Sequence, residues 1–312
     1  MQIALSTKAL CTLAISVLAG SLPASVAHSD TITVCLDGSC DFTSPNDAVA
    51  AANEGDIIQI AEGNYLLTQA LSLYDEDIVI RGAVDASGRP TTVLNGQNTT
   101  YQINALHQSS ATKIENLVLI NGGGTHAAVY MFGCVGMTFR NCLFQGNQRG
   151  AIYLNSSSAT LMDCEIIGNS GTSVGAGIYV HGSVTLIDCV LSGNIASYSG
   201  GGIYVPSGAV VNLDRTRVCG NSAPQGAQIG QTSNGTVNDL GGACIKIDCN
   251  SCPTPQSCPA DLDGNKLVNG ADLTFMLSMW GSCPGCSADI NFDGLVGGAD
   301  LSAMLSAWGN CG

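Results

Sequence analysis

A repeated pattern in the middle of the chain constrains the fold more than any other feature. Each copy has a small-apolar-Tyr-apolar strand, a turn, a second apolar strand and a closing Gly-Asn. The four copies, which begin at positions 128, 151, 177 and 202, are AVYMFGCVGMTFRNCLFQGN, AIYLNSSSATLMDCEIIGN, GIYVHGSVTLIDCVLSGN and GIYVPSGAVVNLDRTRVCGN. The spacing of their closing asparagines matches one coil of a β-solenoid. It is clearly shorter than a helical-pair repeat or a propeller blade.

Equivalent residues of successive coils are expected to lie above one another, because strand pairing stacks the coils about 4.8 Å apart. The pattern predicts an inward row of Cys142, Cys164 and Cys189 that begins at Leu117, and an outward row of tyrosines on the opposite side of a strand. The tyrosine row comprises Tyr130, Tyr153, Tyr179 and Tyr204. The closing asparagines are expected to take a left-handed backbone and to pair their amides along the axis. The sequence therefore predicts a parallel β-helix.

The segment before the repeats has the features of a first coil. Ser44 is a typical helix N-cap and Pro45 follows it, so a short helix is expected to about Asn53. Strands EGDIIQI and EDIVIRG come next. With this order of cap helix and Gly-Asp-x-Ile-x-Ile strand, residues 31–248 resemble the right-handed parallel β-helix superfamily, the pectin lyase-like fold that includes pectate lyases. The resemblance implies an all-β solenoid of about eight coils.

The start of the chain, residues 1–27, reads as a secretory signal peptide. Lys8 precedes an apolar stretch from Ala9 to Gly20, and small residues at Ser25 and Ala27 fit cleavage after Ala27. Of 15 cysteines, 14 lie beyond the cleavage point. An even number of cysteines in an exported chain favours disulfides. No later segment has the length of a membrane span. The protein is therefore expected outside the cell, either released or attached to the cell surface.

The charge balance excludes one class of partner. The chain has 10 Lys and Arg against 24 Asp and Glu, a formal net charge of −14. Nucleic acids are polyanions, so a chain with this charge is a poor partner for them.

Catalytic residues of the polysaccharide-cleaving β-helix relatives are not evident in the sequence. It has no Asp-Asp pair with a Gly-His-Gly. Its arginines do not group with a carboxylate cluster; they include Arg140, Arg149, Arg215 and Arg217. The nearest constellation is Asp163 and Asp188, expected on adjacent coils at roughly 5 Å, the spacing of a retaining glycosidase pair, with His181 one strand away. Alternatively, Asn141, Asp163 and Asp188 form an outward row of turn residues with local hydrogen bonds.

A different module follows a proline-containing linker at residues 249–257. Residues 258–312 hold two similar halves, CPADLDGNKLVNGADLTFMLSMWGSC and CSADINFDGLVGGADLSAMLSAWGNC, which begin at positions 258 and 286. Each half contains a loop that begins with the pattern Asp-x-Asp/Asn-x-Asn/Asp and has another Asp at its twelfth position. Such alternating oxygen ligands suit calcium. Expected ligands of the first ion are Asp261, Asp263, Asn265, the Leu267 carbonyl, Asn269 and Asp272. Those of the second are Asp289, Asn291, Asp293, the Leu295 carbonyl and Asp300. The first loop differs by having Lys266 at the sixth position, where the second has Gly294.

Because an Asp closes each loop and a single helix follows it, this module resembles the dockerin family. The resemblance implies two bound calcium ions and docking to a cohesin-like protein. Loop positions ten and eleven, often Ser-Thr in dockerins, are Gly270-Ala271 and Gly298-Ala299, so the identity of the partner stays open. Apolar residues recur at i, i+3, i+4 and i+7 in each helix and are expected mostly to pack the helices together. They are Leu273, Met276, Leu277 and Trp280, and then Leu301, Met304, Leu305 and Trp308.

Cysteine spacing predicts several disulfides. Cys35 and Cys40 are expected to close a small loop. In the module, a helix of about ten residues spans roughly 15 Å, which is too long for a bond between the ends of one half. Pairing of Cys283 with Cys286 and of Cys258 with Cys311 is therefore favoured. Four further cysteines are expected to close the last coil in an undetermined pairing: Cys219, Cys244, Cys249 and Cys252.

Two functions follow from these observations. The preferred one is a secreted β-helix protein that binds a polysaccharide or another surface ligand and is anchored or docked by the calcium-loaded module. The alternative is a dockerin-bearing polysaccharide lyase or glycoside hydrolase. A grouped acidic cleft would distinguish the enzyme from the binding protein.

Overall fold

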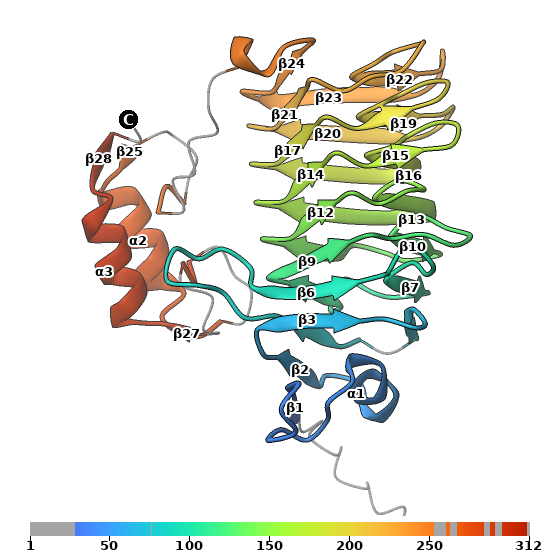
Figure 1. Cartoon of the computed structure of the whole chain (residues 1–312). Helices are drawn as coiled ribbons and strands as arrows, with labels where there is room; N and C mark the ends of the chain where they lie inside the picture. Colours follow the sequence, from blue (N-terminus) through green and yellow to red (C-terminus); the bar gives the residue numbers. More distant parts are fainter. Residues whose placement is uncertain are drawn as a thin grey trace, which may run out of the picture.

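The computed structural model describes residues 29–75, 77–252, 260–262, 267–283, 288–290 and 295–310. The expected signal peptide and most of the expected linker lie outside these residues. The described chain forms two bodies with separate apolar cores, a β-helix and a C-terminal module (Figure 1). None of the described helices is long and apolar enough to cross a membrane.

Each coil of the β-helix contributes strands to three columns of parallel strands. Column 1 contains β4 (Leu71–Tyr74), β7 (Ile103–Leu106), β10 (Val129–Phe132), the first parts of β13 (Ile152–Met162) and β16 (Ile178–Ile187), β19 (Ile203–Val205) and β22 (Ile229–Gln231). Column 2 contains β1 (Thr31–Val34), β2 (Ile57–Ile60), β5 (Val79–Arg81), β8 (Lys113–Glu115), β11 (Met137–Arg140), the second parts of β13 and β16, β20 (Val210–Asp214) and β23 (Thr236–Gly241). Column 3 contains β3 (Gly63–Leu66), β6 (Thr92–Asn95), β9 (Leu117–Ile120), β12 (Leu143–Gln145), β14 (Glu165–Ile167), β17 (Val190–Ser192), β21 (Arg217–Cys219) and β24 (Cys244–Lys246).

Long strands join two of these columns. Because β13 and β16 run through the bend between columns 1 and 2, the two columns form one 14-stranded sheet, while column 3 is a separate 8-stranded sheet. Two short strands, β15 (Ser170–Gly171) and β18 (Ile195–Ala196), pair in the turns between columns 3 and 1. The eight strands of column 3 confirm the expected parallel β-helix of about eight coils.

The predicted ladders are present. Tyr130, Tyr153, Tyr179 and Tyr204 are consecutive in-register partners in column 1. The cysteine row is buried in the core, and each thiol donates to a carbonyl of the preceding coil, as Cys164 does to Phe139 at 3.6 Å. Burial raises the pKa of the Cys164 and Cys189 thiols well above its usual value, so these groups are apolar packing residues rather than nucleophiles.

The asparagine ladder lies inside the turns between columns 3 and 1. Side-chain amides link Asn147 to Asn169 at 2.8 Å, Asn169 to Asn194 at 2.9 Å and Asn194 to Asn221 at 2.9 Å. The expected amide pairing is confirmed, but the expected left-handed backbone is one residue earlier. The glycine before each asparagine has the positive φ, for example 63° at Gly168, because glycine has no Cβ to oppose it.

The two ends of the β-helix are closed differently. Helix α1 (Pro45–Ala51), capped by Ser44 as expected, adds Ala48 and Val49 to the core at the first coil. At the other end, the 3₁₀ helix η1 (Cys249–Ser251) folds back over the last coil. The described disulfides are Cys35–Cys40, as expected, together with Cys219–Cys249 and Cys244–Cys252, which settle the pairing in the last coil.

The C-terminal module has approximate two-fold symmetry. Helices α2 (Gly270–Ser278) and α3 (Gly298–Ser306) lie side by side (Figure 1). Each half contributes a two-residue strand to the other, so β25 (Leu267–Val268) pairs with β28 (Gly309–Asn310), and β26 (Gly281–Ser282) with β27 (Leu295–Val296). The buried core contains three equivalent residues from each half: Ala260, Val268 and Met276, with Ala288, Val296 and Met304.

The apolar helical stripes pack together at their inner residues, as expected, and are partly exposed at their outer residues. Met276 and Met304 are buried, whereas the outer residues of each stripe are about half exposed. Their exposed fractions are 52% for Leu277, 51% for Trp280, 52% for Leu305 and 49% for Trp308. Each helix buries one apolar residue fully, and Leu273 and Leu301 pack partly buried against the same core, so the remaining apolar area of the stripes stays on the surface. Cys283 is disulfide-bonded, and its expected partner Cys286 lies outside the described residues, as do Cys258 and Cys311.

Candidate functional sites

A row of polar turn residues, which we call the turn row, connects columns 2 and 3. It consists of Asn116, Asn141, Asp163, Asp188 and Arg215, all with φ between 44° and 57°. Asn141 donates to Asn116 at 2.8 Å. The backbone N–H of Asp163 donates to Ile187, the residue before Asp188, at 3.1 Å. The structure thus brings Asp163 and Asp188 to equivalent positions of adjacent coils in an outward row.

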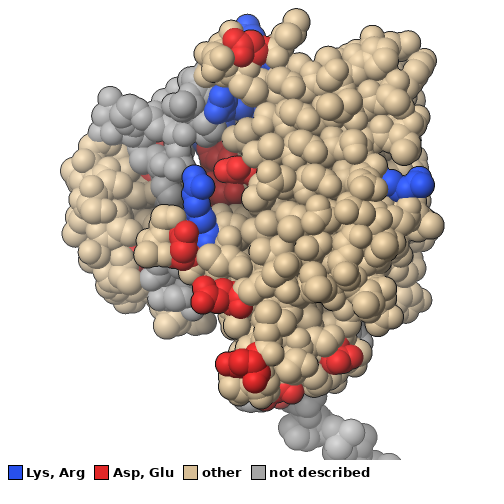
Figure 2. Space-filling model, in the orientation of Figure 1, with Lys and Arg blue, Asp and Glu red and all other residues tan. Residues whose placement is uncertain are grey.

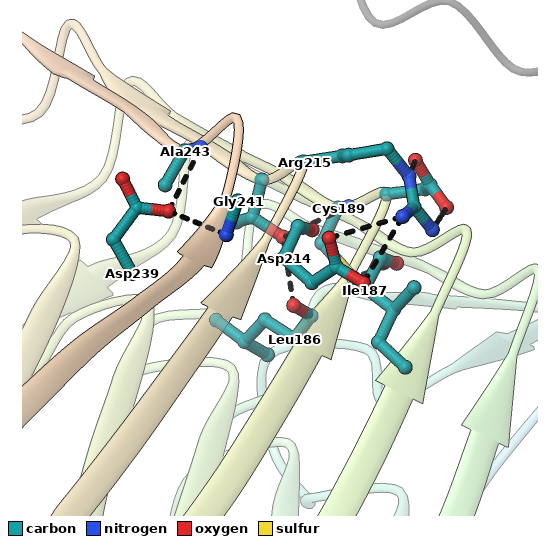
Figure 3. Close-up of polar contacts among 10 residues, drawn as sticks. Leu186, Ile187, Cys189, Asp214, Arg215, Asp239, Gly241 and Ala243 are labelled. Atoms are coloured by element: carbon teal, nitrogen blue, oxygen red, sulfur yellow. Dashed lines mark hydrogen bonds and ion pairs between the residues drawn. The ribbon is translucent and has the colours of Figure 1, made fainter. Parts of the chain in front are cut away.

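Arg215 gives Asp188 a counter-ion that the sequence interpretation missed. Its Nε and Nη2 donate to the two carboxylate oxygens of Asp188 at 2.8 and 2.7 Å. Its Nη1 donates to Asp214 at 3.0 Å (Figure 3). These hydrogen bonds raise the pKa of the Arg215 guanidinium, while burial raises that of the Asp214 carboxyl. The expectation that the arginines stand apart from carboxylates is therefore wrong for Arg215. The signal was available, since Arg215-Thr216 aligns with Asp188-Cys189 in the repeat.

Asp163 has a different environment from its neighbour. Desolvation by the surrounding protein raises the pKa of the Asp163 carboxyl. The positive charge of Arg140 lowers this pKa, and the negative charge of Asp188 raises it. Because water reaches the Asp163 side chain, screening weakens these effects. Arg140 is largely buried beside it, and this burial lowers the pKa of the Arg140 guanidinium. The turn row therefore combines one carboxyl whose pKa is raised with one that is ion-paired.

His181 does not join the two carboxyl groups. It lies near the start of β16, whereas Asp188 follows the end of the same strand, roughly 20 Å away along the backbone. Its exposed ring accepts a hydrogen bond at Nδ1 from the backbone N–H of Ser156 at 3.2 Å. The three residues expected to act together are thus divided between a carboxyl pair and a separate surface histidine.

The outward side of column 1 and its adjoining turns carries a continuous run of aromatic rings. The run consists of Tyr101, His126, Tyr130, Tyr153, Tyr179 and Tyr204, with successive centroids 4.5 to 5.7 Å apart. The rings of Tyr153 and Tyr179 are stacked and nearly parallel, at an interplanar angle of 6°. Burial is the main cause that raises the pKa of Tyr179, and the neighbouring phenols of Tyr153 and Tyr204 raise it further. The hydroxyl of Tyr179 therefore stays protonated and can donate a hydrogen bond.

Three further rings on the same side were missed by the sequence interpretation. Tyr74, His107 and Phe132 meet edge to face at 5.9 and 5.7 Å, and the side chains of Tyr74 and Phe132 are 58% and 40% exposed. Phe132 lies two residues after Tyr130 on one strand, so its outward position could have been inferred from strand alternation. Next to it, Asn155 donates to the Tyr130 hydroxyl at 3.1 Å. We call this surface, with the ring run, the aromatic face.

The aromatic face has few charges. The seven strand segments that form column 1 contain no Asp, Glu, Lys or Arg. Charged side chains instead gather beside the C-terminal module, and most of the β-helix surface in the same view is uncharged (Figure 2). A ligand on the aromatic face would therefore meet ring surfaces, hydroxyls and amides, which favour an uncharged molecule.

The expected calcium ligands are only partly described. Asp263, Asn265, Asn291 and Asp293 lie outside the described residues. Asp272 and Asp300 are buried at the start of α2 and α3, where Asp272 accepts backbone N–H groups of Leu262 and Asn269 at 2.7 and 2.9 Å. No group of three or more His, Cys, Asp or Glu side chains suited to a metal occurs within the described part of the chain.

The other described ligands of the module have the chemistry that a hard cation needs. Asp289 is buried and Asp261 is half-buried. Asn269 caps α2 by accepting from Ala271 at 2.8 Å, and its amide donates to the Leu267 carbonyl at 3.2 Å. Leu295 occupies the matching strand position in the second half. Carboxylate, amide and carbonyl oxygens are the preferred ligands of calcium, so the residues present fit this ion.

Comparison with known proteins places the β-helix in a family. Residues 27–251 match the family described as "Right handed beta helix region". Two solved structures of the pectin methylesterase from Aspergillus niger, one deglycosylated and one penultimately deglycosylated, are similar at 13% identity, with TM-scores of 0.44 and 0.42; in each case the match covers 72% of this chain and 87% of that one. A search of curated proteins finds no match. The chain belongs to the right-handed β-helix family.

Proposed function

We propose that this protein is a secreted β-helix protein that binds an extended, uncharged polysaccharide along the aromatic face and is anchored by a calcium-loaded, dockerin-like module. The observation that carries the binding proposal is the aromatic face itself, a strip of rings, hydroxyls and amides across several coils of column 1. Exposed apolar surface of this kind is typical of binding sites. The described disulfides fit an extracellular setting.

The ligand class follows from the shape and charge of the face. Exposed rings such as Tyr74 and Phe132 offer flat apolar contact to the C–H groups of a sugar, and Asn155 and the tyrosine hydroxyls offer hydrogen bonds. A polyuronate would need cationic partners, and the column 1 strands have none. The net charge of −14 further opposes an acidic chain.

The module is proposed to hold two calcium ions and to attach the protein to a cohesin-like partner or to the cell surface. The ions would be held by the oxygen ligands expected from the sequence, with Asp272 and Asp300 closing the two loops. Bound calcium would fix both loops against the helices. The exposed pairs Leu277 with Trp280 and Leu305 with Trp308 offer apolar anchors to a protein partner, and large aromatic anchors commonly dominate such interfaces.

The binding proposal is tested by pull-down on insoluble polysaccharides. Wild-type protein is expected to bind at least one neutral chain, such as cellulose, mannan or chitin, and not pectate. Two substitutions introduce the residue found at the same register in a neighbouring coil: Tyr130→Asn, matching Asn104, and Phe132→Asn, matching Asn155. Each should weaken binding about tenfold, the loss typical of an aromatic anchor. Tyr198→Ser, at an exposed ring in a turn outside column 1, is the control. Equal binding by all four proteins would refute the proposal.

One observation favours the enzyme as a second candidate. The raised pKa of Asp163, next to the ion-paired Asp188, is the kind of contrast that separates a general acid from a nucleophile in a retaining glycoside hydrolase. In that case Asp163→Asn and Asp188→Asn would each abolish release of reducing ends, while His181→Ala would not. No release from any neutral or acidic polysaccharide by wild-type protein would remove this candidate.

A further inference from the structure

A serine and a histidine meet beside the aromatic face, at a break in the pairing of β13 with β16. The register of the two strands shifts between Asn155 and Ser157, so Ser156 is the extra residue of a β-bulge. Regular alternation after the outward Asn155 would direct the Ser156 side chain into the core. Instead Ser156 is exposed, and Ser157 takes the buried position. Bulges that redirect a side chain in this way are common next to active sites.

The backbone of Ser156 is held in a strained conformation. Its φ is 49°, in the left-handed region. The other non-glycine residues with positive φ in the described chain are mostly asparagine and aspartate, which tolerate this region better than serine does. Strain of this kind is concentrated at functional sites, where the surrounding structure maintains it. An exposed hydroxyl on a strained backbone is also how many hydrolases present a nucleophilic serine.

His181, in the next coil, is placed to act as the base for this serine. Its Nδ1 accepts the backbone N–H of Ser156 at 3.2 Å, so the neutral ring has its lone pair at Nδ1 and its proton at Nε2. The Ser156 hydroxyl oxygen lies 3.5 Å from the same Nδ1. Contacts between a nucleophile and its base are often this long without substrate and shorten when substrate binds. Both side chains are exposed, so a substrate can reach them.

The neighbours of Ser156 can position a substituted sugar. Asn155, which precedes Ser156, is the register partner of the partly exposed Phe132. Its amide donates to the Tyr130 hydroxyl at 3.1 Å. An amide has two hydrogens, so the second can donate to a carbonyl oxygen that becomes negatively charged during a reaction. A sugar stacked on Phe132 would therefore hold a substituent close to a nucleophile, a base and an oxyanion donor.

We propose that Ser156 and His181 form a hydrolytic dyad that removes ester-linked acyl groups, such as acetyl, from a neutral polysaccharide on the aromatic face. The substrate class rests on the proposed binding function. Ser156 Oγ attacks the ester carbonyl carbon, and its proton passes to His181 Nδ1. The bond from that carbon to the sugar oxygen breaks, and His181 gives the proton to the sugar oxygen. Water then attacks the acyl-serine and gives a proton to His181. The bond from the carbon to Oγ breaks, the carboxylic acid leaves, and Oγ regains its proton.

A fluorophosphonate reagent tests the dyad directly. An activated serine displaces fluoride and forms an Oγ–phosphorus bond, which peptide mass spectrometry locates. The full-length mature protein should be labelled at Ser156, and heat-denatured protein should not. Ser156→Gly should lose the label and keep its melting temperature, because glycine adopts a positive φ without strain. His181→Ala should be labelled about a hundred to ten thousand times more slowly, the usual contribution of a general base. Ser233→Ala, at an exposed serine between β22 and β23, is the control.

Release of acetate from acetylated mannan tests the substrate class. The wild type and Ser233→Ala should release acetate, whereas Ser156→Gly and His181→Ala should not. Absence of the label in the folded wild type, or equal labelling of the wild type and His181→Ala, would overturn the dyad alone, because pull-down on neutral chains measures the binding function separately. A labelled Ser156 with release from a small acetate ester, but from no acetylated polysaccharide, would overturn the assigned substrate. Should His181→Ala misfold, as judged by circular dichroism, His181→Gln tests the same point, since an amide keeps a hydrogen-bonding group but is not a base.

Discussion

Removal of one amide from the asparagine ladder should destabilise the β-helix far more than an ordinary asparagine substitution. Asn169 is almost fully buried and makes four side-chain hydrogen bonds. Its Oδ1 accepts from the backbone and side chain of Asn147 at 3.1 and 2.8 Å, and its Nδ2 donates to Phe144 at 3.0 Å and to Asn194 at 2.9 Å. Asn169→Ala would remove all four in a space that water cannot easily enter.

The size of the effect follows from which groups keep another partner. The Asn147 amide still donates to Leu119, and the Asn194 oxygen still accepts from the Asn169 backbone. The Asn147 backbone N–H and the inward side of the Phe144 carbonyl lose the partner that the ladder supplied. At about 1 to 3 kcal/mol for each buried group left unsatisfied, the free energy of unfolding should fall by about 2–6 kcal/mol.

Urea unfolding followed by circular dichroism measures this change, which should lower the midpoint by about 1 M or more. Asn238→Ala is the matched control, because this exposed asparagine makes a single side-chain hydrogen bond, to Asn212 at 2.9 Å. The control should cost less than about 1 kcal/mol. If Asn169→Ala unfolds at the same urea midpoint as the control, the view that the asparagine ladder is buried and that all its amide groups are hydrogen-bonded is refuted.

Three further predictions concern the module, the turn row and the thiols. Calcium at about a hundred times its dissociation constant should stabilise the module by about 2.7 kcal/mol, so EDTA should lower its melting transition, measured by calorimetry on the whole chain; an unchanged transition would contradict the sites. The pKa of the Asp163 carboxyl is raised in the folded protein, so ionisation of this carboxyl opposes folding. The free-energy cost is absent below the pKa that the carboxyl has in the unfolded chain, and it is complete above the pKa that it has in the folded protein. Asp163→Asn should therefore gain melting temperature relative to wild type as the pH rises above about 4, the ordinary pKa of an aspartate, and a relative loss would reverse the assignment. The buried thiols Cys134, Cys142, Cys164 and Cys189 should react with a thiol reagent only after unfolding, and reaction in the native protein would show that the core opens.

Much of the β-helix was predictable because its signals are local and repeated. Successive coils place equivalent residues at one register, so Tyr130 pairs with Tyr153, and Cys164 lies between Cys142 and Cys189. The cap at Ser44 also follows from neighbouring residues alone. The backbone at the Gly-Asn bend was assigned to the wrong residue, because both residue types tolerate a left-handed conformation and only Gly168 and its equivalents adopt it.

The candidate sites were predictable only where they follow the repeat. Asp163 and Asp188 align in the sequence and lie at equivalent positions of adjacent coils in the structure, whereas Arg215 breaks the aspartate pattern and was overlooked as the partner of Asp188. His181 was expected near the two aspartates because it belongs to the same coil as Asp188. The sequence did not show that a single continuous strand, β16, separates the two residues. Side-chain contacts such as Tyr74 with His107 join residues of early coils that have no clear repeat signal, so they needed coordinates.

A glycan array probed in parallel with wild-type protein and a Tyr130→Asn/Phe132→Asn variant tests the central claim most directly, namely that the aromatic face binds an uncharged polysaccharide. The account predicts that the wild type marks neutral oligosaccharides of several units and that the variant loses this signal while it keeps the same melting temperature. Signal confined to acidic glycans, or equal signal from both proteins, would contradict it.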